Sequence, residues 1–429
     1  MEFNYVFHDD CINSLCFIST IKYALTISLT YKRYNRYVYN ISSIDAKKKY
    51  INLKHYNNLK TLSCHRNHRN ISHLTSLQSL CLNKNLKINH LNKFVNLTYL
   101  KLDHNYLVNS IDDLISLKIL YLGCNEKITC LTIFTNLIEL HLCYNNKINN
   151  LNKLINLKKL SLNYNILFTN IEELRLLEEL DIGFNKLSRL PSLNYLKIIN
   201  LSLNNEINTL PSWMSLKQIN FGSNKRIEYI NHLTNLEKIK FESNDAVRII
   251  DDLILLTKLD LGNNNKINFV NSLTNLYELN LSMNGRISNL NLLINLRILN
   301  LKTNRIIGDI SRLTNLKILR LGFNNTIDTI FTLTRLTELH LEFNDKINNI
   351  DSLIQLKILN IGFNEKIHSV CKLKKLKILH LGYNKLIYDY YQCEKLKKIE
   401  SSVERNIVGN CLNMTSTKIY KIFEFFFND

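Results

Sequence analysis

The sequence predicts an α/β-type solenoid built from one 20-residue unit that recurs about 17 times over residues 59–400. Leucines return at the same places in every unit, and each unit carries an asparagine at one fixed position. Apolar and polar residues alternate around each pair of leucines, which indicates a short strand with one buried face. We therefore expect a horseshoe with a parallel β-sheet on its concave face and irregular or 3₁₀ turns on its convex face.

The strand part of the unit is seen clearly in residues 296–304, which read L-x-x-L-x-L-x-x-N. The same pattern recurs every 20 residues, except for one step of 19 before Leu196 and one step of 18 before Leu77. We expect Leu299 and Leu301 to face the interior, and Ile298, Asn300 and Lys302 to point outward. One unit alone cannot bury its leucines, whereas stacked units can.

The return part of the unit has apolar residues three positions apart, as in Ile347, Ile350, Leu353 and Leu356. This segment is too short for a long helix and suits extended or 3₁₀-like turns.

The repeated asparagine stands where the chain turns after each strand. A polar side chain buried at a turn must be hydrogen-bonded, so we expect these amides to bond the backbone of their own and the neighbouring turn and to form a ladder. A column of ligand-binding asparagines is the less favoured alternative. The members of this column are Asn67, Asn85, Asn105, Asn125, Asn145, Asn165, Asn185, Asn204, Asn224, Asn244, Asn264, Asn284, Asn304, Asn324, Asn344, Asn364 and Asn384.

These features resemble the leucine-rich-repeat family over roughly residues 59–400. The short unit is more similar to the bacterial and phosphatase-regulator varieties than to the helix-rich ribonuclease-inhibitor type. A last unit, Leu396–Ile399, carries Glu404 in place of the asparagine. We expect residues 46–58 to form a connector or N-terminal cap and residues 401–429 to cover the other end of the core.

The first 45 residues hold a second pattern. Asp9 and Asp10 precede an apolar helical stretch, and residues 27–34 read Ile-Ser-Leu-Thr-Tyr-Lys-Arg-Tyr. This segment resembles the F-box family, which begins Leu-Pro-x-Asp/Glu and contains a Leu-Ser-Leu-Val-Cys/Ser-Lys-Arg-Trp element. The chain departs from it at His8, Tyr31 and Tyr34, and we expect a small helical segment over residues 1–45.

The F-box resemblance implies docking on the Skp-type linker of a cullin-RING ubiquitin ligase. Exposed apolar residues on two short amphipathic helices would bury against partner helices. The alternative is that the segment only caps the first repeat. The docking residues that the resemblance implies are Phe7, Asp10, Ile12, Leu15, Leu25, Ile27, Leu29, Lys32, Arg33 and Tyr34.

No catalytic motif is found. The chain lacks GxxxxGK[ST], HExxH, GxSxG and GxGxxG, so we expect neither an enzyme nor a cofactor. Cys64, His65 and His68 could hold zinc, but the four-ligand spacing of a structural zinc site is missing. We expect these three to be surface residues and no metal to be bound.

The solvent-facing strand positions are the expected binding surface for a partner protein. Aromatic side chains near Arg and His are typical binding anchors. The alternative for the aromatic residues is that they stack on one another at the edge of each turn. The candidate residues are Arg320, Phe323, Glu338, His340, Phe343, Asn360, Phe363, His380 and Tyr383.

The net charge of +19 invites a nucleic-acid function. The lysines are spread through the repeats, however, and acidic residues recur at expected concave positions, which argues against a uniformly basic track. Those acidic residues are Glu139, Glu179, Asp181, Asp260, Glu278 and Glu338.

The expected compartment follows from the cysteines and the N-terminus. The ten cysteines are irregularly spaced, no signal peptide is evident and no apolar run is long enough to span a membrane. We expect a cytoplasmic or nuclear protein that is not secreted.

Together the patterns predict a protein-interaction scaffold that acts as the substrate-recognition adaptor of a cullin-RING ubiquitin ligase. The alternatives are a plain leucine-rich-repeat regulatory module without a ubiquitin role and, less favoured, a nucleic-acid binder.

Overall fold

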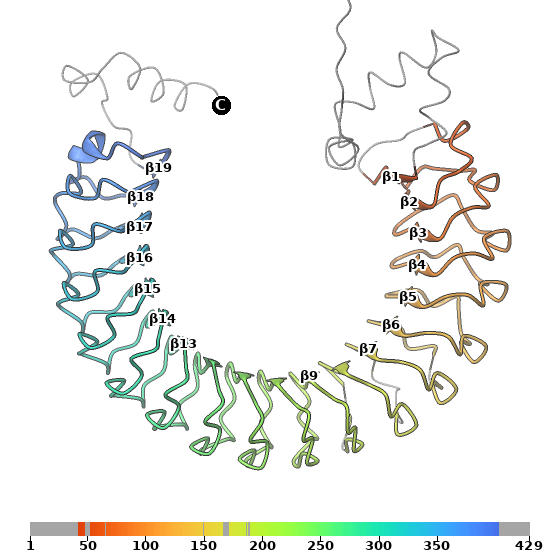
Figure 1. Ribbon diagram of the computed structural model, residues 1–429, viewed down its shortest axis with the longest axis horizontal. Coiled ribbons are helices and arrows are strands. Elements are labelled where there is room, and N and C mark those ends of the chain that lie inside the picture. The colour runs from red at the N-terminus through yellow and green to blue at the C-terminus, as the bar shows by residue number, and fades with distance from the viewer. Residues whose placement is uncertain are drawn as a thin grey trace, which may run out of the picture. The chain divides into compact units, whose positions relative to one another are not determined.

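A short strand forms at the centre of each leucine pattern in the computed structural model of the chain (Figure 1). The structure describes residues 42–47, 52–64, 66–148, 150–165, 171–185, 187 and 189–402. The chain divides into two units, Met1–Leu177 and Glu178–Asp429. Each unit is a parallel β-solenoid, and within each the strands lie on the inner side of the curve that its turns follow.

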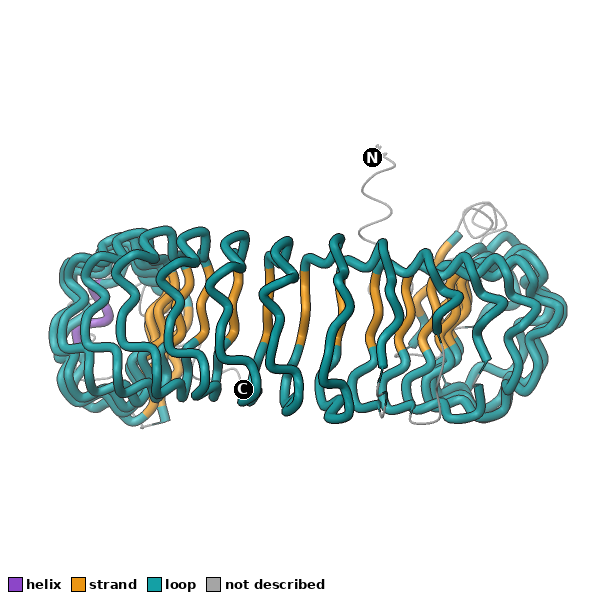
Figure 2. The backbone as a smooth tube through the Cα atoms, turned by 90° about the horizontal axis from the view of Figure 1, so that it is seen from below, coloured by secondary structure: helices purple, strands orange, loops and turns teal. Residues whose placement is uncertain are grey.

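The strands of the first unit are β1 (Ser43–Asp45), β2 (Thr61–Ser63), β3 (Ser79–Cys81), β4 (Tyr99–Lys101), β5 (Ile119–Tyr121), β6 (Glu139–His141) and β7 (Lys159–Ser161). The strands of the second unit are β8 (Glu179–Asp181), β9 (Ile198–Asn200), β10 (Gln218–Asn220), β11 (Lys238–Lys240), β12 (Lys258–Asp260), β13 (Glu278–Asn280), β14 (Ile298–Asn300), β15 (Ile318–Arg320), β16 (Glu338–His340), β17 (Ile358–Asn360), β18 (Ile378–Gly382) and β19 (Lys398–Ser401). Figure 2 shows the strands side by side, with loops making up the remainder of each turn.

Within each unit, every strand pairs in parallel with the strand of the next turn. Leu299 lies opposite Leu319, which lies opposite Leu339, so residues 20 apart share one row across the sheet. This register places equivalent residues of successive turns next to one another, so that they form continuous columns of side chains. The second unit departs from it at β18 and β19, where the register shifts between His380 and Gly382.

The alternation expected of the strands is confirmed. Leu299 and Leu301 are completely buried, whereas Lys302 is exposed. Fully burying one such leucine stabilises the fold by roughly 1.5–3 kcal/mol. Because every turn contributes leucines to the same core, stacked turns bury apolar surface that a lone turn would leave exposed to water.

The return segment packs as its threefold spacing predicts. Ile350 and Leu353 are buried, and the N–H of Leu353 donates to the carbonyl of Ile350 at 3.0 Å. Such three-residue closures recur along both units as separate turns. The described residues contain one regular 3₁₀ helix, η1 (Asp389–Gln392), and no α-helix, so the helical part of the predicted α/β class is not found in them. A 20-residue turn leaves no room for a long helix after its strand and its tight turns.

The expected asparagine ladder is present. In Asn304, the side-chain oxygen accepts the N–H groups of Ile306 and Ile307, both at 3.1 Å. Its Nδ2 donates to the carbonyls of Asn284 at 2.7 Å and Leu281 at 3.2 Å, both belonging to the preceding turn. The same arrangement recurs at most of the other asparagines of the column, which are buried. Each amide thus satisfies backbone groups that would otherwise be buried without partners.

Asn67 was wrongly assigned to this column, because it is exposed. His68 is 2% exposed, and its carbonyl accepts the Nδ2 of Asn85 at 3.2 Å. The step of 18 residues between Leu59 and Leu77 displaces the chain at this point, so the neighbouring histidine backbone takes the place of the asparagine.

A second column of asparagines, which we did not anticipate, joins successive turns on the opposite side of the coil. Asn275 donates through Nδ2 to the carbonyl of Ile254 at 2.9 Å, and Asn315 donates to Ile294 at 2.9 Å. Asn156, Asn235 and Asn295 do the same with their preceding turns. These asparagines are exposed or half-buried, and each belongs to an Asn-Leu pair at the end of its return segment. They supplement the buried ladder.

The two asparagine columns predict unequal losses of stability. Replacing Asn304 by Ala leaves the N–H groups of Ile306 and Ile307 and the carbonyl of Asn284 without this partner, so we expect the free energy of unfolding to fall by about 2–4 kcal/mol. Asn315→Ala, the matched control, removes two exposed bonds, the one to the carbonyl of Ile294 and the one from Arg335, and should cost less than about 1 kcal/mol. Urea unfolding of both variants measures the difference. Equal losses would show that the buried ladder has no special role.

Candidate functional site

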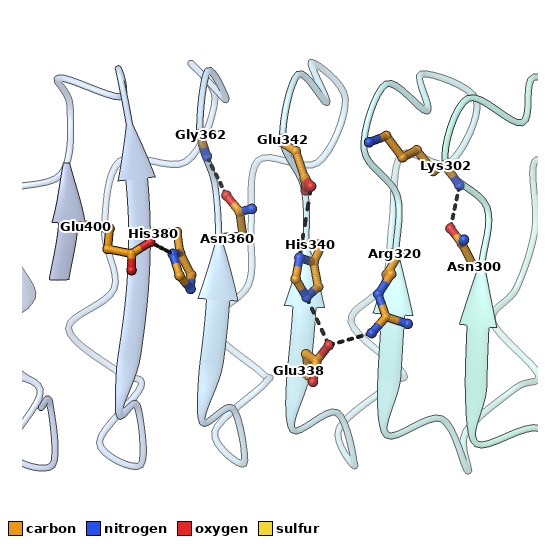
Figure 3. Close-up of polar contacts among 10 residues, drawn as sticks. All are labelled: Asn300, Lys302, Arg320, Glu338, His340, Glu342, Asn360, Gly362, His380 and Glu400. Atoms are coloured by element: carbon orange, nitrogen blue, oxygen red, sulfur yellow. Dashed lines mark hydrogen bonds and ion pairs between the residues drawn. The ribbon is translucent and has the colours of Figure 1, made fainter. Parts of the chain in front are cut away.

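The solvent-facing strand positions form the candidate surface, and those of β15 to β18 are half-buried rather than part of the core. In β15 and β16 they place Arg320, Glu338 and His340 side by side (Figure 3). Arg320 Nη2 donates to Glu338 Oε1 at 2.9 Å, and His340 Nε2 lies 3.0 Å from the same oxygen. The structure therefore brings together three of the predicted binding residues through one carboxylate.

Two other predicted residues belong to separate contacts. Asn360 uses its side-chain oxygen to accept the N–H of Gly362 at 3.1 Å, within its own turn. His380 Nδ1 lies 2.5 Å from Glu400 Oε2, a residue of β19 that was not among the predicted set. Glu342 adds a further carboxylate at 4.0 Å from His340 Nδ1. The polar side chains of β15 to β18 are thus held in local hydrogen bonds and one Arg–Glu ion pair.

The predicted aromatic column is formed by Phe323, Phe343, Phe363 and Tyr383. The ring centroids of the first three follow one another at 4.3 and 4.2 Å, with interplanar angles of 12° and 14°. Tyr383 continues the column at 4.8 Å but is tilted by 41°. The stacking expected as the structural alternative is therefore present, yet the four rings remain 42%, 37%, 41% and 54% exposed. Stacking and exposure coexist because each ring covers only the faces of its neighbours.

The backbone explains why this column exists. Phe343 has a φ of 55° and is the third residue of a tight turn, which the N–H of Asn344 closes on the carbonyl of Leu341 at 3.1 Å. A positive φ at this place is required by a type II-like turn. The same geometry recurs in turn after turn, so the side chain before each asparagine projects in one fixed direction. At β18 the positive φ falls on Gly382 instead, which accompanies the tilt of Tyr383.

A second polar and aromatic cluster, which we did not anticipate, lies on β4 to β6 of the first unit. Tyr121 donates its hydroxyl to Glu139 at 2.7 Å, and His141 Nε2 lies 2.8 Å from the same oxygen. The ring of Tyr121 stacks on His141 with centroids 4.0 Å apart. Lys101 Nζ lies over the same Tyr121 ring, 4.4 Å from its centroid.

This cluster repeats the design of the second unit. In both, the sequence Glu-Leu-His supplies a carboxylate and an imidazole, and the preceding strand supplies a donor: Tyr121 in one and Arg320 in the other. The sequence signal was available, because Glu139 and His141 occupy the same repeat positions as Glu338 and His340.

Partial burial and hydrogen bonding shift the pKa values of this cluster. Burial, reinforced by the bond to Glu139, raises the pKa of Tyr121 above its usual range. For Glu139, burial favours the neutral form, but the hydrogen bonds from His141 and Tyr121 outweigh it and lower the pKa. Glu139 is therefore an ionised acceptor at neutral pH, and Tyr121 a protonated donor.

The solvent-facing strands of the second unit also line a hollow of about 440 Å³, between β9 and β15. Its lining mixes Lys238, Lys240 and Lys258 with Asp260 and Glu278. Lys258 Nζ pairs with Glu278 at 2.6 Å. The acidic positions expected to interrupt a basic track are present on this surface.

Zinc is not supported by the residues considered for it. Cys64 and His68 are 3% and 2% exposed, so the expectation that they lie on the surface was wrong, while His65 falls outside the described residues. Cys64 occupies a core position equivalent to a repeat leucine, and burial raises the pKa of its thiol to about 12. A thiol that resists ionisation is a poor metal ligand. Within the described segments, no group of three His, Cys, Asp or Glu side chains is placed to hold a metal ion.

The F-box-like docking residues, Phe7 to Tyr34, lie outside the described residues. The described part of that segment begins at residue 42 and contributes β1, whose Ile44 lies opposite Leu62 of β2 and is buried. In the described ranges, none of the helices has the length and hydropathy needed to cross a membrane.

Comparison with known proteins places the fold. Neither a family model nor a curated protein matches the chain. A leucine-rich-repeat protein of Leptospira interrogans is 24% identical, covers 85% of this chain and 97% of its own, and superimposes with a TM-score of 0.56. An internalin of Listeria monocytogenes is 20% identical over 80% of this chain and 87% of its own, with a TM-score of 0.35. The first likeness shows that the chain has a leucine-rich-repeat-type fold.

The lowered pKa of Glu139 predicts a pH dependence. Because the folded pKa lies below its ordinary value of 4.5, ionisation stabilises the fold above that value, and the contribution disappears as the pH falls through the lowered pKa. We expect Glu139→Gln to lose less stability than wild type between about pH 6 and about pH 3, as measured by urea unfolding. Glu126→Gln, an exposed control, should retain the wild-type loss. An unchanged pH slope in Glu139→Gln would contradict the assignment.

Proposed function

We propose that the chain is a protein-binding scaffold, without catalytic activity, that holds a partner protein against the solvent-facing positions of β15 to β18. The observation that carries the proposal is the aromatic column, Phe323, Phe343, Phe363 and Tyr383. Its rings stack at 4.2–4.8 Å and yet are 37–54% exposed. Four consecutive apolar rings left open to water have a large area still to bury.

The surroundings of the column support a protein partner. Arg320, His340 and His380 lie in the adjacent row, and each is already paired with a carboxylate of this chain. Aromatic and arginine side chains of this kind dominate protein interfaces, whereas charges that are already paired fix orientation more than affinity. The column and the row together suit an apolar partner segment with hydrogen-bonding groups along one side.

A nucleic-acid partner is less well supported by this surface. Its cations are neutralised by neighbours at short range, as in Arg320 with Glu338 at 2.9 Å and Lys258 with Glu278 at 2.6 Å. Phosphate binding draws its affinity from cations that are free to replace counterions.

The finer proposal is that the bound protein is a substrate of a cullin-RING ubiquitin ligase, for which this chain is the adaptor. It is supported by the F-box-like sequence of residues 1–45, above all Ile27–Tyr34, standing directly before the repeats. The plain binding module without a ubiquitin role remains the competing proposal, and the two differ in what the N-terminal segment contacts.

Replacing two rings of the column should abolish partner capture. Phe343→Asn with Phe363→Asn removes the apolar surface but keeps a residue that tolerates positive φ. We expect the amount of partner retained in affinity purification to fall at least about tenfold, as for the loss of binding hot spots. Phe331→Asn is the matched control, because Phe331 is 64% exposed but lies on the return segment. An identical set of captured proteins from all three chains would refute the binding surface.

The ligase proposal is tested in the full chain, because deleting residues 1–45 would also remove β1. Leu25→Asp with Leu29→Asp places charges in the F-box-like segment, so we expect the Skp-type linker and cullin to be lost from the purified complex. Ile115→Asp with Ile155→Asp makes the same change at residues 59% and 55% exposed in the first unit and should retain them. If neither linker nor cullin accompanies the unaltered chain, the ligase proposal fails while the scaffold proposal stands.

A further inference from the structure

A hollow of about 630 Å³ lies on the strand face at the beginning of the first unit, over β2 to β4. Four cationic side chains line it: Lys47, Arg66, Lys84 and Lys101. Tyr99 and the hydroxyls of Ser63 and Ser79 are also in its wall, and no carboxylate is among the residues of this wall. Positive charge and hydroxyl donors therefore converge here without an acidic residue in the lining.

Two of the four cations have no partner of their own. Lys47 lies 3.8 Å from Asp45, and Lys101 lies 3.3 Å from Asp103. Arg66 and Lys84 are exposed, and the described part of the chain gives neither of them an ion pair. They are available to an incoming anion.

Asp103 is the carboxylate that pairs with Lys101 of this wall. Asp103 accepts the N–H of Gly123 at 2.8 Å and the Nδ2 of Asn83 at 3.3 Å, in addition to its contact with Lys101. It is thereby held by its own turn and its two neighbours. In the described part of the chain, neither Asp103 nor Asp45 forms an ion pair with Lys84.

Lys84 holds the same position in its repeat as the aromatic residues of the column hold in theirs. Lys84 has a φ of 55°, and its N–H donates to the carbonyl of Asp103 at 3.1 Å, as the equivalent N–H of Phe343 donates to Gly362 at 3.0 Å. The two residues hold the same place in their turns. The repeat thus projects a cation at β3 where it projects a phenyl ring at β16, and the two surfaces select different ligand chemistry.

We propose that this hollow is a separate site for a short acidic segment of a partner protein, with Arg66 and Lys84 as its principal contacts. The proposal rests on the protein-binding function above and names the chemistry of a second contact. The segment carries two or more carboxylates that pair with the free cations, while the hydroxyls of Ser63 and Ser79 donate to its remaining oxygens.

The extent of the hollow favours an acidic peptide over a polynucleotide. Three strands about 4.8 Å apart span only on the order of 10 Å. Beyond them, at β6, the strand face presents Glu139, held ionised by Tyr121 and His141. A longer polyanion that continued along the strand face would meet this carboxylate, whereas a short acidic segment ends before it.

The test is direct binding of fluorescent peptides to the full chain, followed by anisotropy. The probes are a peptide with a run of Asp and Glu, the same peptide with Asn and Gln, and a single-stranded oligonucleotide of equal net charge. We expect only the acidic peptide to bind well, with weakening as salt is added. Arg66→Gln with Lys84→Gln should weaken it about tenfold.

The control is Lys127→Gln with Lys147→Gln, which removes the same charge from exposed positions of the first unit that do not line the hollow. It should change the affinity less than about twofold, and circular dichroism should show that both double variants are folded. Equal binding of the acidic and neutral peptides, equal weakening in both double variants, or tighter binding of the oligonucleotide at the same residues would overturn the proposal. Partner capture through Phe343 and Phe363 is measured separately, so the scaffold proposal survives such a failure.

Discussion

The buried asparagine at each turn is the interaction on which the solenoid depends. The chain must reverse direction after every strand, and the reversal leaves backbone N–H groups and carbonyls inside the core. One amide satisfies both kinds of group: in Asn304 the oxygen accepts from Ile306 and Ile307, and the nitrogen donates to Asn284. Since the donor side of most of these amides reaches the preceding turn, as in Asn304 with Asn284, the amide also sets the distance between turns. Burial of the leucines supplies most of the free energy of folding, and the hydrogen bonds of the asparagines determine the path of each turn.

This arrangement separates the residues that build the molecule from those that give it a surface. The turn before each asparagine holds one residue at positive φ whatever its side chain, from Lys84 and Thr303 to Phe343. The backbone strain of an L-residue there is a cost of roughly 1–2 kcal/mol that the ladder and the core offset. Charge or aromatic character can therefore change from turn to turn while the path of the chain remains the same.

Much of this fold could be predicted from the sequence, because a period repeated so often fixes the register of every strand. The burial of Leu299 and Leu301 and the bonding of Asn304 follow directly from their positions. The prediction failed where the period itself is broken, at Asn67, where a turn is shortened and His68 takes over. Cys64 was misjudged because a small apolar side chain in a leucine position gives no distinctive signal.

The candidate sites were less predictable than the fold, because they depend on pairs of residues from neighbouring turns. Arg320 and Glu338 are 18 positions apart, as are Tyr121 and Glu139, and only the parallel register makes them neighbours. The cationic hollow around Arg66 and Lys84 required knowing which carboxylates are already engaged, a property of geometry and not of composition.

Those cross-turn pairs carry a consequence for how such a chain can change in length. Gaining or losing one complete 20-residue turn would preserve the core and the buried asparagine ladder, since successive turns share one register. A turn inserted between β15 and β16, however, would separate Arg320 from Glu338 and interrupt the stack of Phe323 on Phe343. The fold therefore tolerates duplication of a whole turn, whereas the proposed recognition surfaces do not. Duplications that spare those surfaces must fall in turns such as those between β9 and β14.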